Sequence, residues 1–109
     1  MTKKQKQKIY KSIQERLVPA LNPRAIYIFG SFARDEERKY SDIDVLIEQE
    51  TPLSMPKRAT AAYKYLRGMQ IPFDILVYTP RELCERVKDK YSVAHEAVCG
   101  GIKIYEKHV

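Results

Sequence analysis

I-Y-I-F-G-S-F-A-R-D-E-E-R-K-Y-S-D-I-D-V-L-I, residues 26–47, sets the plan of the whole chain. Two apolar runs, Ala25–Phe29 and Val45–Ile47, are short and rich in β-branched or aromatic residues, which is typical of strands. A Gly-Ser pair follows the first run, and an Asp-Ile-Asp triplet opens the second. The residues between the pair and the triplet are mostly charged or polar. This pattern predicts two strands joined by a polar connection.

Gly30 and Ser31 stand where the first predicted strand ends. Glycine permits a sharp turn that brings backbone N–H groups close to a ligand, and a helix that begins at Ser31 points its free N–H groups at the same ligand. Asp42 and Asp44 are two positions apart, so on a strand both side chains emerge on one face. Two adjacent carboxylates repel each other unless a cation lies between them. The pattern predicts a phosphate cradle beside paired carboxylates, as a metal–triphosphate site requires.

A third carboxylate, Asp74, lies inside an apolar segment, Ile71–Tyr78, which we expect to be another strand. Burying a charge among apolar residues is costly unless the charge has a partner. Asp74 therefore needs a metal ion, an arginine or solvent. A salt bridge to a neighbouring arginine is the alternative to metal binding, but the pair Asp42 and Asp44 favours the metal.

These residues resemble the signature of the DNA-polymerase-β-type nucleotidyltransferase superfamily. That signature is an apolar residue with Gly-Ser, a spacer, and then Asp-apolar-Asp-apolar. Phe29-Gly30-Ser31 and Asp42-Ile43-Asp44-Val45 fit it in order and spacing. Superfamily members carry a third carboxylate on a later strand, and Asp74 looks like it. At this length the chain is most similar to the minimal nucleotidyltransferase (MNT) group, whose members often act as antitoxins to HEPN-domain toxins.

The resemblance implies that Asp42, Asp44 and Asp74 are both the catalytic residues and the metal ligands, and that Gly30 and Ser31 bind the nucleotide. The implied cofactor is Mg²⁺, with two ions expected. The implied reaction transfers AMP from ATP to a protein hydroxyl, expected to be a tyrosine of a cognate HEPN toxin, so that the chain acts as the antitoxin.

Two other functions are compatible with the same residues. The protein could be an antitoxin that masks its toxin by direct binding without catalysis, or a nucleotidyltransferase that acts on a small molecule or an RNA end. One departure from the family pattern is Asp35, which stands where many members have glycine a few residues after Gly-Ser.

Length and charge limit the organisation of the chain. With 109 residues we expect one domain with one modest core, a single minimal nucleotidyltransferase domain over residues 1–109. The net charge of +6 arises in residues 1–24, which hold seven of the 20 Lys and Arg but one of the 14 Asp and Glu. We expect this lysine-rich segment to be a solvated helix face, with nucleic acid or an acidic partner as the less favoured alternative.

No apolar run approaches the roughly 20 residues of a membrane span, and the N-terminus lacks the apolar region of a secretory signal. We therefore expect a cytoplasmic protein without a membrane partner; a homo-oligomer is left open. Cys84 and Cys99 are too few and too far apart for a zinc site or a disulfide framework. Both are expected to be buried as small hydrophobic residues.

The remaining pattern predicts an α/β (α+β) fold, a small mixed sheet of about four strands flanked by helices. A last strand is expected at 102–105. The helices are expected at 3–18, ended by Pro19; at 31–37, capped by Ser31; at 56–67, ended by Gly68; from Pro80, capped by Thr79; and at 92–98.

Overall fold

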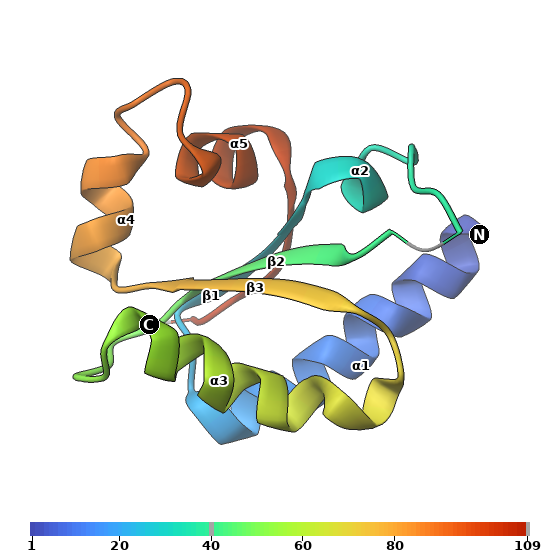
Figure 1. Cartoon of the computed structure of the whole chain (residues 1–109), viewed down its shortest axis with the longest axis horizontal. Coiled ribbons are helices and arrows are strands. Elements are labelled where there is room, and N and C mark those ends of the chain that lie inside the picture. Colours follow the sequence, from blue (N-terminus) through green and yellow to red (C-terminus); the bar gives the residue numbers. More distant parts are fainter. Residues whose placement is uncertain (40, 109) are drawn as a thin grey trace.

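The computed structural model describes residues 1–39 and 41–108. Figure 1 shows a sheet with helices on both sides. The elements are α1 Lys3–Leu21, β1 Ala25–Phe29, α2 Gly30–Ala33, β2 Ile43–Glu48, α3 Met55–Leu66, the 3-10 helix η1 Arg67–Met69, β3 Phe73–Tyr78, α4 Pro80–Arg86, α5 Val93–Gly100 and β4 Ile102–Glu106. The predicted α/β (α+β) plan with four strands is confirmed.

The strands form one mixed sheet in the order β3-β2-β1-β4. β1 pairs antiparallel with β2 and β4, whereas β2 and β3 run parallel. Parallel neighbours need a crossover connection, which α3 supplies between β2 and β3. β1, which leads into the Gly-Ser pair, lies inside the sheet and is buried along its whole length, as its continuous apolar run predicted.

Different helices cover the two faces of the sheet. Val45 of β2 belongs to the core formed with α1 and α3, whereas Leu46 belongs to the core formed with α4 and α5. In Figure 1, α1 and α3 lie below the sheet, and α4 and α5 lie above it. Since side chains alternate along a strand, Asp44 on β2 and Asp74 on β3 share the face of α4 and α5.

α1 is longer than the sequence predicted, because it continues through Pro19 to Leu21. Proline removes one helical hydrogen bond, but at this position the loss falls in the last turns of the helix. Leu17 is fully buried and Leu21 packs against the same core, and this burial offsets the loss. The helix ends instead at Asn22, whose φ of 48° is left-handed.

α2 is shorter than the sequence predicted. It spans Gly30–Ala33, and its N-cap residue is Phe29 rather than Ser31. Asp35 has a φ of 59°, a left-handed conformation that stops the helix from reaching residue 37.

The start of α4 was predicted correctly, because Thr79 caps it in a capping box with Glu82. Ser92, expected as the first residue of the next helix, is instead the N-cap of α5, which spans Val93–Gly100. The end of α3 differs, because Gly68 lies inside η1 and the chain leaves η1 at Gln70, whose φ is 57°.

The prediction that both cysteines are buried was wrong, because Cys84 and Cys99 are exposed. Leu83 of α4 and Ala97 of α5 take the core positions on these helices. Within residues 1–39 and 41–108, none of the helices is both long and apolar enough to cross a membrane.

Candidate functional site

Two of the three predicted carboxylates lie opposite each other on neighbouring strands. Asp44 on β2 is the register partner of Asp74 on the parallel strand β3. Neighbouring strands are about 4.8 Å apart, so the two side chains leave the same face side by side. Asp42 lies just before β2 and acts electrostatically on Asp44. The fold thus brings Asp42, Asp44 and Asp74 to one end of the sheet.

Asp44 carries the electrostatic strain of this cluster. Partial burial raises the pKa of its carboxyl group most, and the negative charges of Asp74 and Asp42 raise it further. Asp42 and Asp74 are exposed, whereas Asp44 is half-buried. A cation bound beside Asp44 would relieve this repulsion.

Gly30 lies directly against Asp44. Its φ is +73°, which favours glycine, and a Cβ atom at this position would collide with the Asp44 carboxylate. Phe29, the residue before Gly30, is the register partner of Asp44 on β1. Only glycine therefore lets the chain turn into α2 this close to the carboxylate cluster.

Ser31 follows Gly30 in α2, and its carbonyl accepts a hydrogen bond from the Glu36 N–H at 2.8 Å. This bond ties α2 to the loop after it. Asp35 in that loop has the left-handed backbone that glycine adopts readily and that aspartate tolerates. Aspartate at position 35 therefore adopts a backbone conformation that would also suit glycine.

The donors at this site fit a divalent cation that arrives with phosphate groups. Among the described residues, no group of three or more His, Cys, Asp or Glu side chains could hold a metal ion. Mg²⁺ usually takes one or two protein carboxylates and fills its remaining positions with phosphate oxygens and water. The strained Asp44 and the exposed Asp42 and Asp74 supply oxygen ligands of this kind.

Arg34 and Glu96 flank the cluster. Glu96 on α5 raises the pKa of Asp44 and Arg34 lowers it, after the larger effects of burial, Asp74 and Asp42. The Arg34 guanidinium lies 3.8 Å from the Glu96 carboxylate and 3.2 Å from the Glu36 carboxylate. Sequence analysis gave no role to Glu96, because no local pattern links α5 to the end of β1.

Tyr63 of α3 fixes β3 on both sides of Asp74. Its hydroxyl donates to the Phe73 carbonyl at 2.7 Å and accepts from the Ile75 N–H at 3.2 Å. β3 is an edge strand, so these backbone groups have no neighbouring strand to bond. Asp42 and Tyr63 also line a hollow of about 510 Å³ between α3, η1 and the start of β3.

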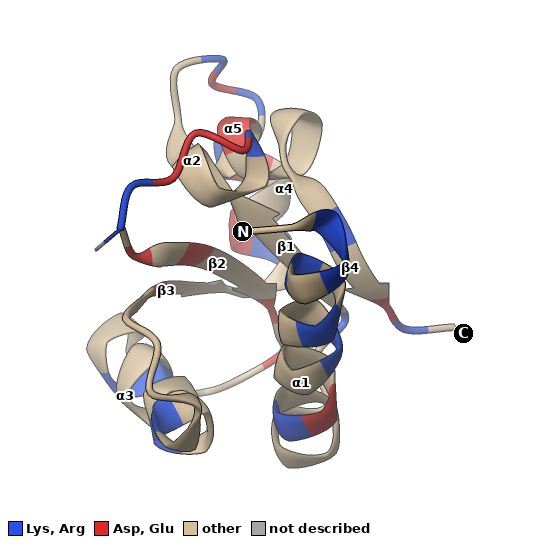
Figure 2. Ribbon diagram, turned by 90° about the vertical axis from the view of Figure 1, so that its right-hand side faces the viewer, with Lys and Arg blue, Asp and Glu red and all other residues tan. Residues whose placement is uncertain are grey.

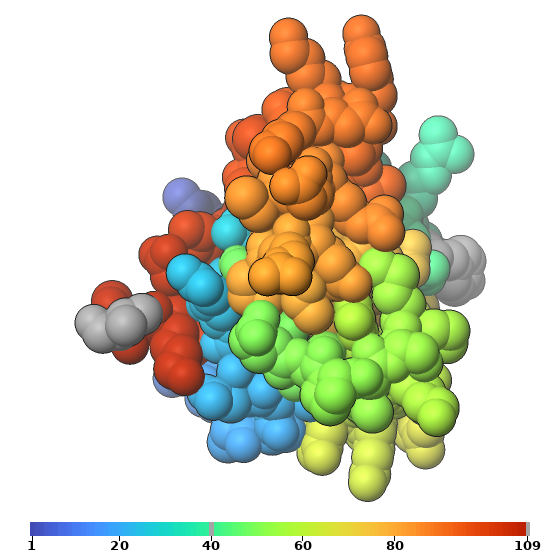
Figure 3. Space-filling view, turned by 90° about the vertical axis from the view of Figure 1, so that its left-hand side faces the viewer, coloured from blue at the N-terminus to red at the C-terminus, as the bar shows by residue number. Residues whose placement is uncertain are grey.

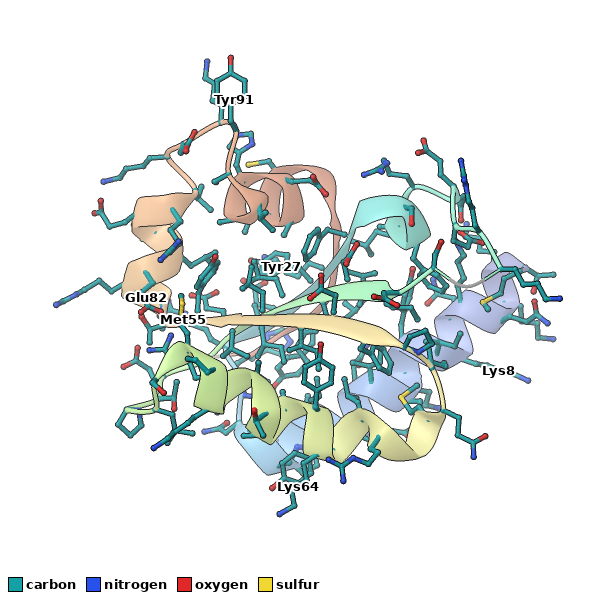
Figure 4. The ribbon with its side chains drawn as sticks, viewed as in Figure 1. Lys8, Tyr27, Met55, Lys64, Glu82 and Tyr91 are labelled. Carbon is teal, nitrogen blue, oxygen red and sulfur yellow. The ribbon has the colours of Figure 1, made fainter. Side chains whose placement is uncertain are left out.

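Lys6 is an exception to the predicted solvated lysine face of α1, because it is buried whereas Lys3, Lys4, Lys8 and Lys11 are exposed. Its side chain is 6% exposed, and its ammonium group donates to the Phe32 carbonyl, Asp35 and Glu37. Other basic residues follow the outer side of α1 in Figure 2, and Lys8 points away from the sheet in Figure 4. The charge pattern of the sequence could not single out one lysine among several.

Comparison with known proteins gives one family and several relatives. Residues 6–98 match the sequence model of the nucleotidyltransferase domain family. Two proteins of Methanocaldococcus jannaschii, "Putative protein adenylyltransferase MJ1217" and "Putative protein adenylyltransferase MJ0126", are each 50% identical to the chain over 34 residues. These matches cover 31% of this chain and 35% of each relative, so the chain spans about a third of the curated relatives it matches.

Two solved structures share the fold. One, described as a toxin–antitoxin with AMP-PNP, has a TM-score of 0.64 and 20% identity, with 91% of this chain and 74% of that chain covered. The other, a mutant of the toxin–antitoxin MntA–HpeT, has a TM-score of 0.54 and 20% identity, with 94% and 73% covered. At this level of identity the likeness establishes the fold.

Proposed function

The chain belongs to the nucleotidyltransferase domain family, and on that premise we propose that it transfers AMP from ATP to a hydroxyl group of a toxin protein. In this proposal residues 1–109 form one minimal nucleotidyltransferase domain and act as the antitoxin of a toxin–antitoxin pair. The observation that carries the proposal is the register of Asp44 with Asp74 beside Gly30. This arrangement brings acidic side chains and the turn into α2 to one end of the sheet.

Each residue of the site has a distinct role in this reaction. Gly30 lets α2 approach Asp44, and Ser31 offers its hydroxyl and backbone to the β- and γ-phosphates. Asp42 and Asp44 would hold Mg²⁺ with the triphosphate, with two ions expected, and Asp74 would be the ligand nearest the acceptor. The bound cation would neutralise the charge that develops on the phosphate oxygens.

The transfer itself needs an acceptor hydroxyl in line with the bond that breaks. The hydroxyl oxygen bonds to the α-phosphorus, the bond to the pyrophosphate oxygen breaks, and pyrophosphate leaves. Asp74 is exposed at the edge of the sheet, so a hydroxyl from another protein can reach it and give up its proton there. This exposure supports a protein acceptor, which we propose is a tyrosine of a HEPN-domain toxin.

The relatives support the same class of reaction and partner. Two matched proteins carry the name of protein adenylyltransferases, and one solved neighbour is a toxin–antitoxin with AMP-PNP, an ATP analogue. The repulsion around Asp44 supports a bound cation, because a cation beside these carboxylates would offset it.

The decisive experiment uses less antitoxin than toxin. With ATP and Mg²⁺, we expect a substoichiometric amount of the protein to neutralise a cognate HEPN toxin and to add whole AMP units to its mass. Asp42→Asn/Asp44→Asn should fail even in excess, because the transition-state charge has lost its metal ligands. Asp89→Asn, on the exposed loop between α4 and α5, is the matched control and should act as the wild type does.

The alternative function predicts the opposite result. If the protein masks its toxin by binding, Asp42→Asn/Asp44→Asn neutralises it at equal stoichiometry without ATP. A protective double variant with no mass change on the toxin would overturn the enzymatic proposal. If AMP from labelled ATP is found on a small molecule or an RNA end instead of on the toxin, the acceptor proposed here is wrong, but the protein is still a nucleotidyltransferase.

A further inference from the structure

Lys6 makes an unusually complete set of contacts for a lysine on an outer helix. Its Nζ atom lies 2.7 Å from the Phe32 carbonyl oxygen, 2.6 Å from Asp35 Oδ1 and 2.7 Å from Glu37 Oε1. A lysine ammonium has three N–H donors, so these contacts use all of them. We call Lys6, the Phe32 carbonyl, Asp35 and Glu37 the lysine clamp.

The lysine clamp keeps its charge despite burial. Burial alone disfavours the ammonium, but hydrogen bonds from Lys6 to Asp35 and Glu37 together outweigh it and raise the pKa of Lys6. The ammonium also lies 4.3 Å from the centre of the Phe32 ring. A lysine whose donors and aromatic contact are all occupied holds its partners in place and has no donor left for a substrate.

The segment that the lysine clamp contacts, α2 and the loop after it, is not stable by its own local hydrogen bonds. α2 has four residues, and a single helical turn is unstable without tertiary contacts. Phe32 anchors the helix from below by edge contact with Tyr10. Lys6 anchors both the end of α2 and the loop that follows, through contacts 26 to 31 residues apart in sequence.

The same short segment begins with Gly30 and Ser31. Gly30 fits against Asp44 without room for a Cβ atom, so a small rotation of α2 would change the contact between them. Ser31 is tied to the loop by the Glu36 N–H bond at 2.8 Å. Any movement of the loop away from Lys6 therefore moves the residues proposed to seat the phosphates.

We propose that Lys6 is a positioning residue for nucleotide binding: the lysine clamp on α1 fixes α2 so that Gly30 and Ser31 meet the triphosphate beside Asp44. This inference rests on the proposed function, because it names what holds the phosphate-binding segment. It assigns a specific task to one lysine of the basic N-terminal segment. The exposed lysines of α1 have no part in it.

The test compares Lys6→Met with Lys8→Met. Methionine keeps the unbranched chain but has no donors, and Lys8 is an exposed lysine on the same helix. We expect Lys6→Met to raise the KM for ATP by about tenfold or more with a smaller change in kcat, because misplaced binding groups weaken the complex. Lys8→Met should stay within about twofold of the wild type. Lys6→Arg, which keeps charged donors, should recover part of the affinity.

A second variant distinguishes a loss of ATP binding from a loss of folding caused by unpaired charges. Lys6→Met/Asp35→Asn/Glu37→Gln removes the clamp without leaving buried or half-buried charges unpaired. Folding of each variant is checked by circular dichroism. If the folded triple variant binds ATP as tightly as the wild type, Lys6 only stabilises the fold and the proposal is overturned.

Hydrogen exchange separates this proposal from the proposed function. In the absence of nucleotide, we expect amides of residues 30–37 to exchange faster in Lys6→Met and in the triple variant, with the sheet unchanged. If the wild type binds no ATP, the proposed function fails, while faster exchange limited to residues 30–37 still supports the clamp. Unchanged exchange there would reject the clamp whatever the nucleotide does.

Discussion

At the residue scale, Asp44 is the carboxylate with the most unfavourable surroundings in the candidate site. It is half-buried, in register with Asp74 and against Gly30, and both Asp74 and Asp42 repel its negative charge. A partly buried carboxylate close to like charges reduces the stability of the fold. The strain at Asp44 therefore has a measurable consequence in the protein without nucleotide.

We expect Asp44→Asn to raise the melting temperature at pH 7 by a few degrees in the presence of a chelator. The pKa of Asp44 is raised in the folded state, mainly by burial. The stability that protonated Asp44 contributes is therefore full below the unfolded pKa and is lost as the pH rises through the folded pKa. The asparagine variant avoids this loss, which thermal unfolding at several pH values can measure.

The control is Glu50→Gln, an exposed carboxylate beyond the opposite end of β2, which should not change the melting temperature. Below about pH 4 the advantage of Asp44→Asn should disappear, because the wild-type carboxyl is then protonated as well. An advantage that persists in acid would mean that charge is not its cause.

Tyr63 has a different effect on the neighbouring carboxylate, since it binds the backbone before and after Asp74. We expect Tyr63→Phe to lower the free energy of unfolding by about 0.5–1.5 kcal/mol and to reduce kcat more than ATP affinity. The reason is that Asp74 then lies on an edge strand with fewer fixed hydrogen bonds. Urea unfolding and steady-state kinetics measure the two effects.

Tyr65→Phe is the matched control for Tyr63, because Tyr65 is on the same helix and equally exposed, at 37% against 36%. It should change neither unfolding nor kcat. Equal effects of the two variants would show that Tyr63 contributes only general packing.

At the scale of elements, a buried arginine joins the two helical layers around the edge of the sheet. Arg58 of α3 donates to the Leu53 carbonyl at 2.7 Å and to the Val77 carbonyl of β3 at 3.4 Å, and it pairs with Glu82 of α4 at 2.6 Å. Figure 4 shows Glu82 where α3 and α4 meet, and Figure 3 shows this face of the molecule, with α4 above α3. These contacts of Arg58, which we call the arginine joint, cover the edge of β3 at the end away from Asp74.

We expect Arg58→Met to lower the free energy of unfolding by about 2 kcal/mol, because it removes hydrogen bonds from a charged group and leaves the buried Val77 carbonyl without this donor. The Arg58 hydrogen bond also lowers the pKa of Glu82. Its contribution is therefore present above the unfolded pKa of Glu82 and is lost as the pH falls through the folded pKa. Urea titrations at pH 7 and pH 3 measure both effects.

Arg81→Met tests the same change at an exposed position of α4 and should be nearly neutral. A loss in Arg58→Met that stays the same at pH 3 would mean that the Glu82 pair contributes nothing. ATP affinity should be unchanged in either variant, since the arginine joint lies at the far end of β3.

At the scale of the whole molecule, nucleotide binding should stabilise the fold. We expect ATP with Mg²⁺, at about 100 times its Kd, to add about 2.7 kcal/mol to the free energy of unfolding, since only the folded state has the site. ATP with a chelator should add much less, because the carboxylates then repel the phosphates. Thermal unfolding with and without Mg²⁺ measures the difference.

Asp42→Asn should remove most of the Mg²⁺-dependent increase in the free energy of unfolding, because one proposed metal ligand is lost. Equal stabilisation with and without Mg²⁺ in the wild type would contradict a metal site at these carboxylates. Asp89→Asn again serves as the control.

The sequence by itself determined the local features of this protein. The strand around Ala25–Phe29 follows from its continuous apolar run, and the cap at Thr79 follows from its neighbours in the chain. The sequence predicted one face for Asp42 and Asp44 from the period of two in a strand, but β2 begins at Ile43, so this period applies to Asp44 and not to Asp42. The prediction that Pro19 ends the first helix was wrong, because the packing of Leu17 and Leu21 outweighs a local preference. α3 ends at Leu66, one residue before the predicted end, and η1 follows it.

Only the tertiary structure decided which distant residues complete the site. The register of β2 and β3 placed Asp74 opposite Asp44, and packing of α1 brought Lys6 to Asp35 and Glu37. Packing of α3 brought Tyr63 to the backbone around Asp74. No local sequence pattern encodes these contacts. The sequence around a lysine in a basic helix, or around a tyrosine on α3, does not show whether the side chain faces solvent or the sheet. The position of each is fixed by the burial of the apolar face of its helix, which is a property of the assembled core.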